Sequence, residues 1–507
     1  MSVVLDNEEG VPFEEALDRT GFGLYSVSMT ALAGVVIISF VCIFYSSTIV
    51  VPVSACQLNT TGAQQGMLVA GPIVGVILGA MFWGYVADQH GRKKTLLTSL
   101  IAGATINAFA SLSTDWFFLL ILQFIASLMI SGQYSLAMTL VSESVPLAKR
   151  NIVVLMVTCI FLLSQGLMAV MAMPIVPLTF SYRLPYLDIY WTSWRLLLVI
   201  YSLPSLFTAL WLNHMQESPK FVYSKGTETK ALDILKIIYR INNRDRSDEF
   251  KVKSLMRRTS INFEYVPRNH CMLLFTQPLL KYTLIMTLLF LLEQLAAFKV
   301  WLPTIAHRYV QVVNYGEGRN LTLCSIIASS MDDPKVKENS EIAARCGLDF
   351  EALLIVLVIT MMLSVTTAIM TMAVGRFGRR NMVMIITLIS GGSGMLVNLV
   401  PNSVASAALF VLQLLGIVVI GLYTALCMTL FPTRLRALAM TLTMTGARVA
   451  NFMSIQVINY LLIHSCDLAF YIYGAMLAFS AVVAYFLPRD TPTTRNNHQI
   501  LHEESFD

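Results

Sequence analysis

Three charged side chains lie within long apolar runs of the sequence, where they could bind a charged ligand. Glu293 is in the run 282–302 and Arg448 in the run 437–463. At a rise of about 1.5 Å per residue, both lie roughly 16 Å along a helix, near the middle of a bilayer core. Because their depths are equal, we predict a Glu293–Arg448 ion pair. One interpretation is that the pair only fixes helix packing. The other is that one of the two side chains faces a central cavity and binds a charged or zwitterionic ligand. Lys299, near the end of its run, is expected to extend its ammonium group to the membrane surface.

The elements that position these side chains follow from the composition. Of the 507 residues, 56% are hydrophobic and only 13% are charged, against about 25% charged in soluble proteins. This composition excludes a soluble protein. Because alternating strands are absent, we predict an all-α integral membrane protein with twelve spans. The spans are 29–53, 66–86, 95–112, 117–140, 152–173, 194–213, 282–302, 352–374, 381–400, 404–430, 437–463 and 468–487.

Lysine and arginine in the short loops predict the orientation, with both termini in the cytoplasm. The N-terminal segment is acidic and lacks the basic start of a cleaved signal peptide, so the first span is expected to remain. The net charge of +5 is spread over loops, which argues against nucleic-acid binding. The predicted organisation is a cytoplasmic segment 1–28, a six-helix bundle 29–213, a linker 214–281 with a helical run at 228–241, a second bundle 282–487 with an external loop 303–351, and a cytoplasmic tail 488–507.

Two sequons and four cysteines fall on the side that the charge rule makes external. Asn59 and Asn320 begin the sequons and are possible glycosylation sites. The external cysteines are Cys56, Cys324, Cys346 and Cys466. A Cys324–Cys346 disulfide is one expected pairing, although connectivity cannot be deduced from sequence.

Several cytoplasmic motifs carry a family resemblance. The loop after the second span reads GYVADQHGRKK from Gly84 to Lys94, and ESVPLAKR follows the fourth span from Glu143 to Arg150. The sixth span opens on Trp194-Arg195 and ends at ESPKF, Glu217 to Phe221. Together with EEALDRTGFG at 14–23, FPTRLRA at 431–437 and GAR at 446–448, the pattern resembles the major facilitator superfamily, in the branch of synaptic vesicle glycoprotein two, organic ion transporters and sugar porters.

The resemblance implies two pseudo-symmetric six-helix bundles with a substrate cavity between them near the membrane midplane, and transport by rocking. It also implies a cytoplasmic latch, in which Asp88 meets Arg92 and Glu143 meets Arg150 in the outward-facing state. The expected gate and latch residues are Gly84, Asp88, Gly91, Arg92, Glu143, Arg150, Glu217, Arg376, Arg379 and Arg434.

The second bundle departs from the family pattern, because Gly375 and Thr429 stand where acidic residues are usual. The resemblance therefore leaves two interpretations. One is a secondary carrier or facilitator of a small organic ion or polar metabolite, in a plasma or vesicle membrane. The alternative is a transporter-shaped regulator or receptor that does not transport.

The first bundle offers no carboxylate for proton coupling, since 37–53 contains no Asp or Glu. Uniport or exchange is therefore favoured, with Glu293 the sole carboxylate candidate at depth. Neutral candidates for substrate contact are Gln123, Gln133, Tyr134 and Gln165, each equally explained by hydrogen bonding between helices. No phosphate-binding loop, catalytic constellation or metal-ligand spacing is found, so we expect no enzyme, cofactor or metal. The expected partners are the lipid bilayer and a small-molecule solute, not nucleic acid, and the expected state is a monomer.

Overall fold

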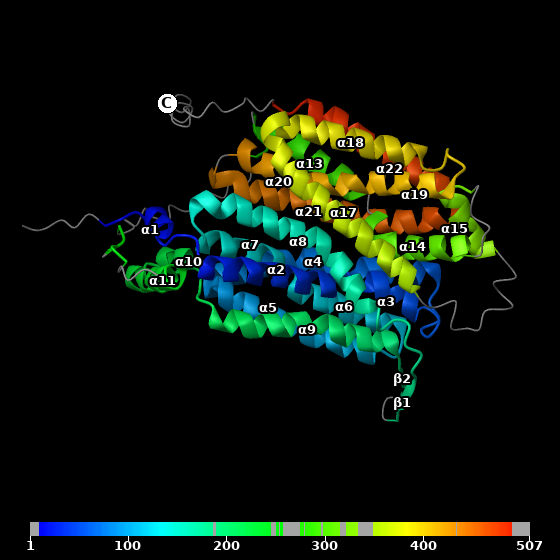
Figure 1. The fold of residues 1–507 in the computed structure, drawn as a ribbon, viewed down its shortest axis with the longest axis horizontal. Coiled ribbons are helices and arrows are strands. Elements are labelled where there is room, and N and C mark those ends of the chain that lie inside the picture. Colours follow the sequence, from blue (N-terminus) through cyan, green and yellow to red (C-terminus); the bar gives the residue numbers. More distant parts are fainter. Residues whose placement is uncertain are drawn as a thin grey trace, which may run out of the picture.

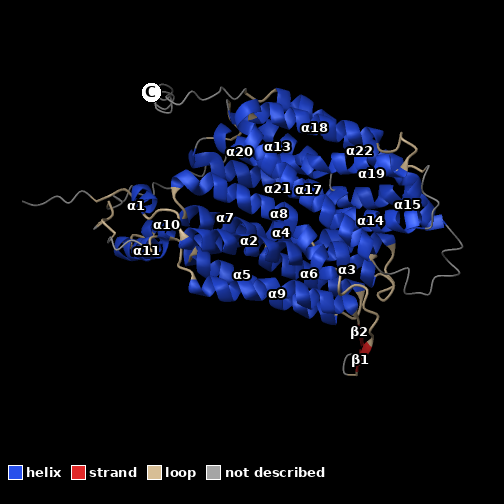
Figure 2. Cartoon of the chain, in the orientation of Figure 1, coloured by secondary structure: helices blue, strands red, loops and turns tan. Residues whose placement is uncertain are grey.

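The computed structural model describes residues 10–185, 189–244, 250–252, 254–256, 274–277, 279–295, 298–314, 321–332, 348–431 and 433–488; within these ranges the side chains of Thr429 and Arg434 are among those outside the description. Helices make up most of this structure (Figure 2). An antiparallel hairpin, β1 (Tyr182–Leu184) and β2 (Ile189–Trp191), projects from one end.

The first group of long helices lies together in the lower half of Figure 1. These helices are apolar because a helix in lipid forms all its backbone hydrogen bonds internally and presents apolar side chains to the lipid tails. Its members are α2 (Leu24–Phe44), α3 (Ser46–Ser54), α4 (Gly62–His90), α5 (Arg92–Phe109), α6 (Trp116–Ile130), α7 (Gln133–Ser144), α8 (Leu147–Ala172) and α9 (Ser193–His214), with a 3-10 turn η1 (Ala110–Leu112).

The second group lies above the first in the same view. The short helix α15 (Leu323–Asp332) lies at the end of the molecule that also carries the hairpin, which we call the α15 end. The long members are α13 (Leu279–Leu295), α14 (Phe298–Asn314), α17 (Phe350–Phe377), α18 (Arg379–Leu396), α19 (Ser403–Leu414), η3 (Leu415–Val418), α20 (Val419–Leu430), α21 (Thr433–His464) and α22 (Cys466–Tyr485).

The two groups repeat one local design. Gly91 joins α4 to α5 at φ 103°, and Gly378 joins α17 to α18 at φ 78°, so each long helix turns back through a residue with positive φ. At the opposite end of each group, Asp115 caps α6 and Asn402 caps α19. Each side chain accepts hydrogen bonds from two backbone N–H groups. The same caps and turns in the same order indicate that the groups are structural repeats.

Ten stretches of the described helices are long and apolar enough to cross a membrane. They coincide with ten of the twelve predicted spans. The other two predicted spans, 381–400 and 437–463, fall on helices α18 and α21. The expected external loop from residue 303 begins later, because α14 continues to Asn314 before the chain reaches α15.

The polar segments pack together at the opposite end, which we call the α11 end (Figure 1). Helix α11 (Glu228–Asn242) is the helical run predicted at 228–241. Its buried Leu232 and Leu235 pack with Phe13 and Leu17 of α1 (Phe13–Arg19). A short helix, α10 (Pro219–Ser224), precedes α11. The N-terminal segment and the linker therefore form one apolar cluster.

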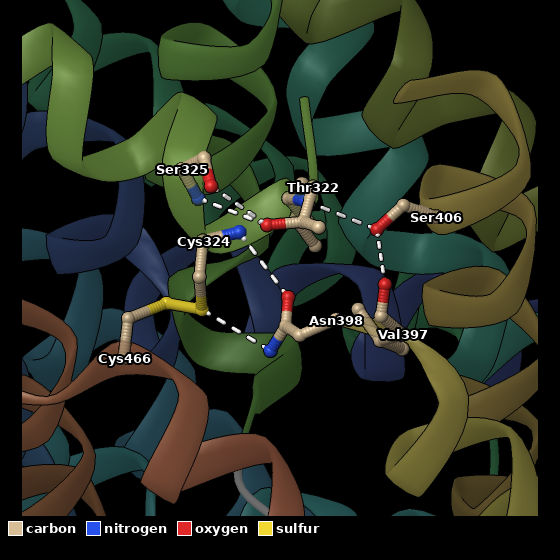
Figure 3. The surroundings of a disulfide bond; sticks show 8 residues. Thr322, Cys324, Ser325, Val397, Asn398, Ser406 and Cys466 are labelled. Carbon is tan, nitrogen blue, oxygen red and sulfur yellow. Dashed lines mark hydrogen bonds between the residues drawn. A yellow bond between two sulfur atoms is a disulfide. The ribbon is translucent and has the colours of Figure 1, made fainter. Parts of the chain in front are cut away.

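A disulfide joins Cys324 of α15 to Cys466 at the start of α22, with the two Cα atoms 5.6 Å apart (Figure 3). The predicted Cys324–Cys346 pairing is therefore wrong; Cys346 itself lies outside the described residues. Asn398 accepts a hydrogen bond from the Cys324 backbone N–H at 3.2 Å. Cys56 is disulfide-bonded as well.

Candidate functional site

The two groups of helices are joined by hydrogen bonds near the α15 end. The Gln456 side chain of α21 donates to the Gly66 carbonyl of α4 at 3.0 Å, and Asn459 donates to the Gly62 carbonyl at 2.8 Å. The absence of a side chain at Gly66 permits this approach, because a Cβ there would overlap the Asn459 amide. Helices α4 and α21 are therefore in close contact at this end.

The same face of α4 is open toward the α11 end. Gly84 lies about five helical turns from Gly66, so the two glycines face the same direction. In the part of the chain that the structure describes, no atom lies within 4 Å of a Cβ built at Gly84. The groups are therefore in contact at the α15 end, and no described residue covers Gly84 toward the other end.

A second contact between the groups runs along α8 and α17. Ser364 donates to the Cys159 carbonyl at 3.0 Å, and Gln165 donates to the Lys299 carbonyl at 3.4 Å. Gly166 brings the α8 backbone against Thr360 of α17. These contacts involve the middle and the α15-side part of α8, which meets α17 at Thr360 and Ser364 and α14 at Lys299.

A cavity lies between the two groups, next to these contacts. Asn451 and Ile455 of α21 line it, and the buried Oδ1 atom of Asn451 has no hydrogen-bond partner in the described structure. Arg448 lies on the same face of α21, since it precedes Asn451 by one turn and Ile455 by two. The other lining residues are Phe44, Tyr45, Ser47, Thr48, Val69, Ile73 and Val300.

Lys299 points into the interface between the groups and not to the membrane surface. Its side chain is 7% exposed. The ammonium nitrogen lies 5.7 Å from the ring centre of Tyr45 and 5.3 Å from that of Phe161, both in the first group. The expectation that Lys299 extends its ammonium group to the membrane surface is therefore wrong. The physical reason is that aromatic faces attract a cation that is withdrawn from water.

Glu293 is 6% exposed and accepts a hydrogen bond from the Gln294 amide at 2.7 Å. The predicted Glu293–Arg448 ion pair is wrong, because no ion pair within 4 Å joins these two described residues. The error has a geometric cause, because equal depth does not fix the direction in which two side chains point. Among the described residues Arg448 has no ion pair or hydrogen bond.

Sequence reasoning missed Gln413, which is 2% exposed and lines a small pocket with Glu293 and Phe298. Neither amide atom of Gln413 has a partner in the described structure. A polar residue in an otherwise apolar run was the available signal.

The four neutral residues predicted to contact substrate lie in two different places. Two pack inside the first group, and two lie near the interface between the groups. Gln123 donates to Ser46 at 3.2 Å within its own group, and the buried amide of Gln133 has no partner among the described residues. Tyr134 packs edge-on against Phe161, with ring centres 5.5 Å apart. Tyr134 and Gln165 therefore adjoin the Lys299 environment, whereas Gln123 and Gln133 are internal to the first group.

At the α11 end, the predicted Asp88–Arg92 pair is present at 2.5 Å. The Asp88 side chain is 69% exposed, and Arg92 is its only ion-pair partner among the described residues. Glu143 lies 3.7 Å from Arg92 and accepts a hydrogen bond from Ser218. Glu217 accepts a hydrogen bond from the Lys93 backbone at 2.9 Å and adjoins Gly91.

The expected Glu143–Arg150 pair is wrong, because Arg150 pairs with Glu14 of α1 at 3.2 Å. Lys220 holds the same carboxylate at 2.6 Å, and the Leu147 backbone donates to Asp18 at 2.7 Å. Partial burial alone would raise the pKa of Glu14, but Lys220 and Arg150 outweigh it and hold that pKa below its ordinary value. The motif resemblance assigned Glu143 as the ion-pair partner of Arg150. In the structure, Glu14 of the acidic EEALDR segment is that partner.

In the second group, the arginines at the turn between α17 and α18 have other surroundings. Arg376 is exposed, Arg379 donates to the Ala425 carbonyl at 3.4 Å, and Arg380 lies over the ring of Tyr485. The Arg434 side chain lies outside the described residues, as does Asn320 of the second sequon. Asn59 of the first sequon is exposed at the α15 end.

Comparison with known proteins assigns the family. The family model of the Major Facilitator Superfamily matches residues 32–331, more than half of the chain. The chain belongs to the Major Facilitator Superfamily. It is accordingly an integral, multi-pass membrane protein of a transporter family, not an enzyme.

Relatives in the superfamily agree with the branch that the motifs indicated. The chain is 25% identical to the putative transporter svop-1 of Caenorhabditis elegans over 47% of its length and 43% of that protein. It is 26% identical to organic cation/carnitine transporter 7 of Arabidopsis thaliana over 45% of its length and 43% of that protein. Mouse synaptic vesicle glycoprotein 2C is 27% identical over 49% of this chain and 34% of the relative. The chain thus spans less than half of the length of these relatives.

Solved structures of the superfamily share the fold. The xylose transporter XylE from E. coli, in a partially occluded inward open conformation, superposes with a TM-score of 0.63. The match covers 92% of this chain and 98% of XylE at 17% identity, which establishes the fold alone.

Proposed function

We propose that the protein transports a small organic ion or polar metabolite by alternating access, as a facilitator or secondary carrier. The observation that carries the proposal is Arg448, a cation without an ion-pair partner among the described residues, on the face of α21 that lines the cavity between the bundles. A cation left unpaired at such depth is costly unless a ligand or water meets it. Glu293 and Arg448 are the charged contacts that we propose for the solute.

The proposed orientation places the α11 end and both termini in the cytoplasm, because Arg92, Lys93, Lys94 and Arg150 lie in its loops. In that orientation the contacts at Gly62 and Gly66 close the external side, and the uncovered Gly84 face is internal. The proposed state is then inward-facing, with the Asp88–Arg92 pair of the first bundle formed in it. We propose a monomer in the plasma membrane or a vesicle membrane.

The names of the relatives support a polar or charged solute. One is called an organic cation/carnitine transporter, and the solved neighbour is a xylose transporter. Membership of a transporter family does not favour the alternative of a non-transporting regulator or receptor. Gly375 and Thr429 replace acidic residues that are usual in the family, and this replacement is compatible with transport. An exposed ion pair stabilises a conformation by only about 0 to 1 kcal/mol.

The test is uptake by the reconstituted protein. Labelled carnitine and xylose are supplied first, then a metabolite mixture analysed by mass spectrometry. A hydrogen bond to a charged group contributes about 1.5 to 3 kcal/mol, so Arg448→Gln should lower the apparent affinity at least about tenfold. Arg240→Gln, which changes an exposed arginine of α11, is the matched control and should leave uptake unchanged.

Asp88→Asn should alter the rate for every accepted solute. Saturable uptake that is insensitive to both Arg448→Gln and Glu293→Gln would contradict the proposed site. The absence of any latch-dependent flux would favour the regulator.

A further inference from the structure

We propose that Lys299 selects the charge of the solute. Its ammonium group, held over two aromatic rings of the first bundle, binds the anionic group of a small organic solute and keeps organic cations away from those rings. Lys299 thereby narrows the solute class of the proposed transport function, on which this role rests, to small organic anions.

The ammonium group of Lys299 has aromatic neighbours and no polar partner in the described structure. It lies 5.7 Å from the ring centre of Tyr45 and 5.3 Å from that of Phe161, although Lys299 belongs to α14 of the second bundle. The side chain is only 7% exposed, and its nitrogen makes no hydrogen bond or ion pair with the described residues. The rings attract the charge, but the N–H donors of the ammonium group stay free for an anionic ligand.

The two rings are the ends of a series of aromatic contacts within the first bundle. Successive ring centres are 4.7 to 6.4 Å apart in the order Tyr45, Phe44, Phe40, Tyr134 and Phe161. Rings at these distances stabilise one another's positions. The aromatic site is therefore built by the first bundle alone, and we expect it to persist when the lysine is removed.

The cavity between the bundles adjoins the same site. Tyr45 lines it, and so does Val300, the residue after Lys299. Gln165 of α8 is fully buried and donates to the Lys299 carbonyl at 3.4 Å, while its amide oxygen has no partner in the described structure. A solute in this region is therefore offered a cation and a hydrogen-bond acceptor.

The charges within the apolar runs also favour an anion. Lys299 and Arg448 are cations and Glu293 is the carboxylate, so these three leave an excess of one positive charge. Glu293 lines a different pocket, with Phe298 and Gln413 of the second bundle. A cationic solute would add to the excess charge and would find the faces of the two rings taken, whereas an anionic solute would balance the charge.

Two small probes separate the two parts of this prediction. β-Hydroxybutyrate carries a carboxylate and a hydroxyl group, whereas choline carries a trimethylammonium and a hydroxyl group. Binding of each probe to the purified protein in detergent is measured by calorimetry, which requires no transport. The wild type should bind β-hydroxybutyrate and should not bind choline.

Lys299→Ala removes the cation and vacates the two rings. The affinity for β-hydroxybutyrate should fall at least about tenfold, because a charged hydrogen bond is lost. Choline binding should appear, because the aromatic faces can then hold a quaternary ammonium group. This gain cannot result from misfolding, and the double variant Lys299→Ala/Tyr45→Leu should lose it again. Lys299→Arg retains a cation and should keep the wild-type preference, as should Lys281→Ala, the matched control at an exposed lysine of α13.

Choline binding by the wild type would overturn the proposal, and so would a Lys299→Ala variant that gains no choline binding. A wild type that binds neither probe would overturn the assignment to an organic anion. Uptake of the same probes into proteoliposomes then tests the proposed function separately. A protein that binds with the expected preference but takes up neither probe would contradict transport and would still support the charge selection by Lys299.

Discussion

Glu14 connects three segments that are far apart in the sequence. Its carboxylate holds Lys220 of α10 at 2.6 Å and Arg150 of α8 at 3.2 Å, while Glu14 itself belongs to α1. Each contact is partly exposed and individually weak. Acting on one carboxylate, they fix the N-terminal helix to the end of α8, which is the helix that also carries Phe161 and Gln165 to the interface.

We expect Glu14→Gln to loosen α1 at neutral pH, since the amide keeps the shape but loses both ion pairs. A loss of about 1 kcal/mol corresponds to roughly fivefold faster amide exchange over Phe13–Arg19. Because the folded-state pKa of Glu14 is lowered, its stabilisation is present above the ordinary glutamate range and is lost as the pH falls through the lowered pKa.

The neighbouring Glu15 provides the control for this prediction. Glu15 pairs with Arg19 on the same helix, so Glu15→Gln should leave the docking of α1 intact. Equal loosening by the two variants would show that the charge of α1, and not the contact with α8 and α10, is what matters.

The turn between α4 and α5 depends on one glycine. Gly91 has φ 103° and ψ 155°, a conformation essentially restricted to glycine. A Cβ at this position would lie 2.5 Å from a carboxylate oxygen of Glu217 and against the Phe221 ring. The turn, the Glu217 contact and the start of α10 therefore form one unit.

We expect Gly91→Ala to lower the free energy of unfolding by about 1 to 3 kcal/mol, measured as a lower thermal midpoint of the purified protein. Gly226→Ala is the matched comparison: Gly226 also has positive φ, but no atom of the described residues lies within 4 Å of its Cβ position. Its cost should be limited to about 1 kcal/mol of backbone strain. If Gly226→Ala were equally harmful, the contact with Glu217 would have no part in the stability of the turn.

At the scale of the whole molecule, the two bundles touch at one end and leave a face uncovered at the other. Gly66 and Gly84 lie on one face of α4, about five turns apart, and report on these two ends. Of these two glycines, Gly66 is the one that contacts the described part of α21. The proposed transport by alternating access predicts such an asymmetry in one of its end states.

We expect Gly66→Ala to destabilise the closed α15 end, because its methyl group would overlap the amide of Asn459. Overpacking costs about 1 to 3 kcal/mol, so exchange at Gln456–Asn459 should accelerate roughly five- to a hundredfold. Gly84→Ala changes the same residue type on the same helix face, where space is free, and should leave exchange unchanged. Acceleration by both variants alike would contradict the assignment of open and closed ends.

The sequence by itself determined the helical membrane architecture, since apolar runs of span length have few alternatives in lipid. It also determined the helix at 228–241, the turn at Gly91 and the Asp88–Arg92 pair, all of which depend on neighbours within a few residues. The motifs of the first bundle were sufficient to indicate the superfamily, because they combine fixed residue types at fixed places in the chain.

Only the tertiary structure decided which distant groups meet. Arg150 pairs with Glu14, 136 residues away, and Cys324 bonds Cys466, 142 residues away. Lys299 finds its aromatic partners in the other bundle, so the direction of its side chain could not follow from its position in an apolar run. Depth and residue type are local properties of the chain, whereas the direction of a side chain depends on how the helices are rotated and packed against one another.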